Sequence, residues 1–115
     1  LDEASLQGEN KIVFVEKGGL RFSKINISDF NLENISNDYL VVSNNESNEE
    51  ILKSVLNGSG RDSHKDVVAL NAALVLWASG TEDDLNKGFS RALLSINQGD
   101  PWKKFLLLKN YLNAN

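Results

Sequence analysis

The stretch DVVALNAALVLWAS, residues 66–79, decides the fold because it is a helical run that is apolar almost all the way round. A helix tolerates this pattern only when other elements surround it, so we expect cover on every side. Asn71 is the single polar residue in the middle of the run. Because a buried amide without partners costs on the order of 1 to 3 kcal/mol, we expect Asn71 to bond something specific, with a loop backbone favoured over a ligand.

Capping residues predict helix boundaries on both sides of this run. Ser or Thr three residues ahead of an acid marks a helix start, Pro fits the first helical position, and Gly favours a stop. The predicted boundaries are Ser47 with Glu50 and a stop at Gly58; Ser63 with Asp66 and a stop at Gly80; Thr81 with Asp84 and a stop at Gly99; and Asp100 with Pro101 at the last start. Four helices therefore follow one another, and the acids of NESNEE, residues 45–50, complement the dipole of the first.

The segment KIVFVEKGGLRFSKINI, residues 11–27, predicts a β-hairpin ahead of the helices. Gly18 and Gly19 supply the positive φ that a type I′ turn needs at both central positions. Apolar residues occupy both faces of the first strand, so we expect that strand to be covered on both sides. The Ser- and Asn-rich stretch 28–48 favours an irregular connection, inside which YLVV, residues 39–42, is compatible with a short strand.

The composition is that of one folded globular domain, with 115 residues, 41% hydrophobic and 24% charged. The net charge of -4 and the scattered basic residues argue against nucleic-acid binding. No apolar run approaches the roughly 20 residues that span a bilayer, so a membrane protein is not indicated. The absence of Cys excludes a disulfide framework and thiolate metal sites, and it agrees with a reducing compartment.

The chain opens with LDEASLQGEN and contains no Met, so we expect it to begin inside a larger gene product. In order, LDEASL, the hairpin, ISDFNL, NEEILKSVLNG, DVVALNAAL, ASGTEDDLNKG and the closing helix resemble the C-terminal part of anthranilate phosphoribosyltransferases. The resemblance covers the whole chain. It implies an α+β piece, a hairpin followed by about four helices, cut from a larger α/β domain with a mostly parallel sheet, so that residues 1–115 form a single partial domain.

The resemblance also implies an activity for the parent protein. Such an enzyme transfers the phosphoribosyl group of phosphoribosyl pyrophosphate to anthranilate in tryptophan biosynthesis, in the cytoplasm, as a homodimer formed by an N-terminal helical domain. The isolated chain is expected to be inactive. Its uncovered strand edges are expected to favour self-association.

In this family a paired Asp-Glu binds magnesium on the pyrophosphate, and this pair falls on Asp2 and Glu3. Adjacent acids alone are common on surfaces, so the assignment rests on the resemblance. The family's GTGGD-type loop and its Lys-His-Gly-Asn segment are absent, so no catalytic or substrate-binding residue is carried over. Asn31 stands where the family commonly has Gly, and LVVSNN replaces a glycine-rich loop, which puts the local loop conformation in question.

Three other residues receive structural interpretations. His64, the only histidine, lies near a helix start beside Arg61 and Lys65, which indicates a solvated surface position. Trp77 and Trp102 lie on apolar helix faces, for which core packing is the default.

Two alternatives stay open. The first is a relative in the same superfamily, either a pyrimidine nucleoside phosphorylase or a nucleic-acid-binding paralogue, although the acidic balance counts against nucleic acid. The second is a stand-alone interaction module that only resembles the enzyme.

Overall fold

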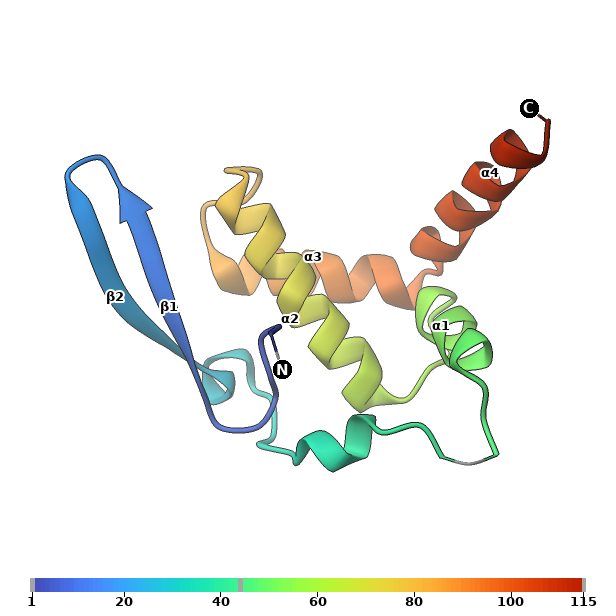
Figure 1. Ribbon diagram of the computed structural model, residues 1–115, viewed down its shortest axis with the longest axis horizontal. Coiled ribbons are helices and arrows are strands. Elements are labelled where there is room, and N and C mark those ends of the chain that lie inside the picture. The colour runs from blue at the N-terminus through green and yellow to red at the C-terminus, as the bar shows by residue number, and fades with distance from the viewer. Residues whose placement is uncertain (1, 44, 115) are drawn as a thin grey trace.

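The computed structural model describes residues 2–43 and 45–114, which form a hairpin followed by four helices (Figure 1). The elements are β1 Glu9–Glu16, β2 Gly19–Asn26, the 3-10 helices η1 Ile27–Phe30 and η2 Asn37–Leu40, and the α-helices α1 Asn48–Leu56, α2 Asp62–Ala78, α3 Leu85–Asn97 and α4 Asp100–Ala114. The predicted α+β order is confirmed. Residue 1, where an initiator methionine is missing, lies outside the described residues. Residue 44, which belongs to the predicted irregular connection, lies outside them as well.

The hairpin turn differs from the prediction by one residue. Glu16 pairs with Gly19, so Lys17 and Gly18 form the loop between the antiparallel strands. Gly18 has a φ of 112°, whereas Lys17 has no positive φ. The predicted type I′ turn at Gly18 and Gly19 is therefore wrong, because that turn needs positive φ at both central residues.

Strand β1 is covered on one face only. Phe14 packs edge-on against Trp77 of α2, with ring centroids 5.1 Å apart, and Ile12 packs against the core. On the other face Val13 and Val15 are exposed. The expectation of cover on both faces is wrong for the part of the chain that the structure describes. Strand β2 pairs along the edge of β1, and no described element covers the face that carries Val13 and Val15.

The core lies where α2 crosses α3 (Figure 1). Ala69, Leu70 and Ala73 of α2 are all fully buried. Helices α2 and α3 approach each other closely at Gly88 of α3, which has no side chain. A Cβ added at Gly88 would lie 3.4 Å from the carbonyl oxygen of Ala73. The remaining core residues come from the N-terminal segment, the hairpin end, η1 and α3, namely Leu6, Ile25, Ile27, Phe30, Phe89, Ala92 and Ile96.

The apolar sequence of α2 predicts cover on every side. The structure does not surround the helix in this way. Val68 and Val75 are exposed, and Val75 retains 68% of its surface. They line an open, largely apolar groove between α2 and α3. The described elements supply cover for one side of the helix and none for this one.

The helix starts follow local capping chemistry in two cases. Ser47 and Glu50 form the predicted capping box ahead of α1. Helix α3 is capped by Asp84, whose carboxylate accepts from the Lys87 N–H at 2.8 Å, so the predicted start at Thr81 is three residues early. Helix α2 begins at Asp62 with Arg61 as its N-cap and no side-chain cap, so the prediction of a Ser63 start is wrong.

The connection between β2 and α1 is irregular, as predicted. Asn31 has a φ of 56°, the left-handed conformation that Asn tolerates better than most side chains and that Gly adopts freely. The departure from glycine at this position is therefore compatible with the loop. Residues 39–42 do not form a strand, because Tyr39 and Leu40 belong to η2.

Helix α4 projects from the other end of the molecule, away from the hairpin (Figure 1). None of its described residues is buried. Trp102 is partly buried and stacks on Phe105 with ring centroids 5.1 Å apart. Trp77 packs against the hairpin, and Trp102 stacks on Phe105 with Lys53 of α1 over its ring, so neither belongs to the central core.

Candidate functional site

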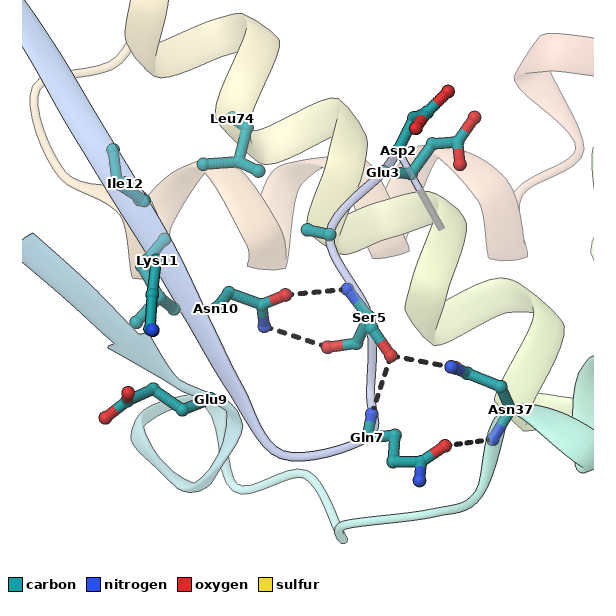
Figure 2. A pocket seen from close by; sticks show the side chains of 12 residues that line it. Asp2, Glu3, Ser5, Gln7, Glu9, Asn10, Lys11, Ile12, Asn37 and Leu74 are labelled. Carbon is teal, nitrogen blue, oxygen red and sulfur yellow. Dashed lines mark hydrogen bonds between the residues drawn. The ribbon is translucent and has the colours of Figure 1, made fainter.

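Asp2 and Glu3 lie side by side in the segment that leads into β1. Both are exposed, and Figure 2 shows their carboxylates pointing the same way, away from the amides around Ser5. Within the described residues neither carboxylate takes part in an ion pair or a hydrogen bond. The two therefore present free oxygen atoms to solvent at one end of an open pocket of 530 Å³, which Figure 2 views from close by.

These two carboxylates fit one particular kind of magnesium site. Mg²⁺ prefers hard oxygen ligands and is commonly held by one or two carboxylates together with waters and substrate phosphates. The described residues contain no group of three or more His, Cys, Asp or Glu that could hold a metal. The pair consequently suits an ion that it shares with a phosphate ligand, and it does not form a closed protein site.

The segment behind the carboxylates is held by side-chain amides. Asn10 accepts a hydrogen bond from the Ser5 N–H at 2.8 Å and donates to the Ser5 carbonyl at 2.9 Å. Asn71 does the same for Ala4, at 2.9 Å in both directions. Two consecutive residues are thus each bound through both backbone groups.

Further contacts continue this support toward β1 (Figure 2). The Ser5 hydroxyl donates to Asn37 and accepts from the Gln7 N–H, and the Gln7 side chain accepts from the Asn37 N–H. Leu6 is only 2% exposed and anchors the segment in the core. The carboxylate pair is therefore attached to an ordered segment through residue 4.

Charge in the pocket is mostly negative. Glu9 also lines it, but Glu9 is paired with Lys24 at 3.0 Å, which leaves Asp2 and Glu3 as the uncompensated acids. Among the described residues on the wall, Lys11 is the one basic side chain. Such a site favours a cation over an anion. Once a cation is bound, its charge allows an anion to bind as well.

The sequence prediction for His64 is wrong. Its side chain is 7% exposed, and its Nε2 atom is buried without a hydrogen-bond partner among the described residues. It lines an apolar groove formed by residues of η2, α1 and α2. Charged neighbours in sequence misled the prediction, because Arg61 points instead to Glu46.

Sequence reasoning identified Asn71 and missed Asn10, Ser5, Gln7 and Asn37. A run of amide and hydroxyl residues around Leu6 was the available signal, since buried loop backbone needs such partners.

Among the residues that the structure describes, none of the helices is long and apolar enough to cross a membrane.

Comparison with known proteins gives a consistent result. Residues 1–101 match the glycosyl transferase family, a/b domain. The chain is 79% identical over 115 residues to an anthranilate phosphoribosyltransferase of Prochlorococcus marinus (strain MIT 9215), and 42% identical over 114 residues to one of Synechococcus sp. (strain CC9311).

The fold agrees as well. The crystal structure of anthranilate phosphoribosyltransferase from Thermus thermophilus superposes with a TM-score of 0.80 at 27% identity, covering 98% of this chain and 32% of that one. The chain spans about a third of the length of the curated relatives it matches, 33% in both cases.

Proposed function

Because this chain belongs to the glycosyl transferase family, a/b domain, we propose that it forms part of an enzyme that transfers a phosphoribosyl group to anthranilate. The observation that carries the proposal is the 79% identity, over the full chain, to an anthranilate phosphoribosyltransferase. Identity over such a length in the same family weighs against an unrelated interaction module. The related nucleoside phosphorylases and nucleic-acid-binding paralogues find no specific support in these residues.

In the proposed reaction the anthranilate amine attacks C1 of the ribose, the bond from C1 to the pyrophosphate oxygen breaks, and the amine loses a proton. Negative charge builds on the departing pyrophosphate. A Mg²⁺ ion held by Asp2 and Glu3 would neutralise that charge. The role of this chain is then to present two carboxylates at a fixed place, and the groups that contact anthranilate are sought outside it.

Assembly and location are part of the same proposal. The homodimer implied by the resemblance would form through a domain outside this chain, in the cytoplasm, where charged phosphoribosyl substrates are retained by the membrane. The isolated chain is expected to be inactive and to self-associate through the bare edges of its hairpin, which sedimentation of the purified chain would detect.

A chimera tests the function. This chain replaces the matching third of the Prochlorococcus marinus (strain MIT 9215) enzyme, and consumption of anthranilate is followed by its fluorescence with phosphoribosyl pyrophosphate and Mg²⁺. We expect activity within about tenfold of the parent, since the exchanged segments are 79% identical. A folded chimera that leaves anthranilate unconsumed would refute the proposal.

A second comparison tests the metal assignment. Exchanging both Asp2→Asn and Glu3→Gln in the chimera should lower activity by about 100-fold or more, because the charge on the leaving group is no longer neutralised. The matched control exchanges Glu33→Gln and Glu49→Gln, two exposed acids elsewhere on the chain. Equal activity of the two double variants would show that Asp2 and Glu3 do not hold the metal.

A further inference from the structure

Asn71 uses its whole side-chain amide on the backbone. Its Oδ1 accepts from the Ala4 N–H at 2.9 Å, and its Nδ2 donates to the Ala4 carbonyl at 2.9 Å. The second Nδ2 hydrogen bond goes to the Val67 carbonyl, one turn earlier in α2, also at 2.9 Å. The amide is therefore fixed to its own helix while it holds residue 4.

The form of this contact fixes orientation as well as position. A single hydrogen bond would let the peptide turn about the donor–acceptor axis. Bonds to both the N–H and the carbonyl of one residue remove that freedom, as they do in a closely paired antiparallel ladder. Glu3 is the next residue along, with its Cα about 3.8 Å from that of Ala4. The position of the Glu3 Cα, from which its carboxylate extends, is thus set by Asn71.

The rest of the segment does not need Asn71 for attachment. Asn10 holds Ser5 through both backbone groups, and Leu6 is buried in the core. Without Asn71 the chain would still be anchored from residue 5 onward. Residues 2–4 would then keep only the packing of Ala4 against the core, and Asp2 and Glu3 carry the two carboxylates.

We propose that Asn71 is a positioning residue for the metal: by holding Ala4 it orients Asp2 and Glu3 so that both can bind a divalent cation shared with pyrophosphate. This inference rests on the proposed function for its choice of ion. This role explains why a polar residue stands in the apolar run from Val67 to Ala78. An apolar side chain could fill the same space, but it could not orient Asp2 and Glu3.

Metal binding without turnover provides the test. Binding of Mn²⁺ to the chimera is measured by electron paramagnetic resonance in the presence of pyrophosphate and the absence of anthranilate. Asn71→Ala, and Asn71→Leu in case the smaller residue leaves a hole, should weaken Mn²⁺ binding by about 10- to 100-fold, the usual effect of losing a partner behind a ligand.

Asn57→Ala is the matched control. Asn57 also accepts a hydrogen bond from a loop N–H, that of Ser59 at 2.9 Å, but it lies at the end of α1. This variant should leave Mn²⁺ binding unchanged. An equal loss in Asn57→Ala and Asn71→Ala would overturn the inference, because it would reflect general loosening of the fold.

A double-variant cycle separates positioning from a purely structural tie. Combined with Asp2→Asn and Glu3→Gln, the Asn71→Ala change should weaken Mn²⁺ binding no further, since it acts only through those carboxylates. Binding that stays within about twofold of the original in Asn71→Ala, or an undiminished loss in the combined variant, would overturn the inference. An inactive chimera that binds Mn²⁺ would refute the proposed function alone.

Discussion

The junction between α1 and α3 offers a sharp test of the packing. Gly58, just after α1, has a φ of 84°, and a Cβ added there would lie 2.7 Å from the carbonyl oxygen of Ile96 and 2.8 Å from that of Asn97. Gly80, just after α2, has a φ of 72° and open space around its Cα. The two glycines share a backbone conformation and differ in their surroundings, so Gly58→Ala and Gly80→Ala form a matched pair.

Both alanines meet the left-handed strain, which is roughly 1–2 kcal/mol for a residue with a Cβ. Only Gly58→Ala adds an overlap with two backbone carbonyls, which cannot turn aside as a flexible side chain could. Overpacking of this kind costs about 1–3 kcal/mol. The free energy of unfolding should therefore fall by about 1–3 kcal/mol more for Gly58→Ala, and its Tm should be lower by roughly 4–12 °C at this chain length.

This difference is measured by thermal and urea unfolding of the original protein, Gly58→Ala and Gly80→Ala. Circular dichroism and tryptophan fluorescence monitor the unfolding. Equal losses in the two variants would refute the reasoning, because they would mean that the turn at Gly58 does not pack on the end of α3 as the structure has it.

Three further predictions concern ionisable side chains. Burial raises the pKa of Asp66, the charge of Asp62 adds to this, and the folded protein therefore holds that proton to a higher pH than the unfolded chain does. Asp66→Asn should raise Tm at neutral pH, with the gain shrinking as pH falls through the folded-state pKa. Hydrogen bonds from the backbone and hydroxyl of Ser47 lower the pKa of Glu50; Glu50→Gln should lower Tm at neutral pH and match the original once pH falls below the folded-state pKa, in a pH series of melts. His64→Leu should raise the free energy of unfolding in urea by about 1 kcal/mol, because it removes a buried nitrogen that has no partner among the described residues; a loss of stability would contradict this.

Local chemistry explains which helix starts could be predicted from the sequence. The Ser47 and Glu50 capping box closes within one turn, so four residues contain all the information. The start of α2 has no such local cap: Arg61 precedes the helix, and its side chain pairs with Glu46, 15 residues earlier. Sequence pattern carries no sign of such a pairing.

One-sided burial was likewise beyond the sequence. The apolar pattern of β1 and of α2 records which faces can be buried, and it does not say which neighbours are present. Val15 is 83% exposed for that reason, and His64, which has charged neighbours in the chain, is buried by helices that approach from elsewhere.

The candidate site was predictable in part. The energetic argument that Asn71 must have a partner holds, since its amide makes three hydrogen bonds, including the predicted bonds to a loop backbone. The identity of that partner, Ala4, could not be read from the chain. The assignment of magnesium to Asp2 and Glu3 came from the resemblance and stays a prediction.

The hydrogen bonds between Ala4 and Asn71 join residues 67 positions apart, and this separation sets an order of events during folding. Closing so long a loop carries a larger entropic cost than forming a turn, so contacts of this range form after local ones. The capping box of α1 and the hairpin can form while Ala4 is still loose. During synthesis Asp2 and Glu3 emerge from the ribosome ahead of α2, yet the bond that holds Ala4 beside them forms only after the middle of α2 has emerged and folded.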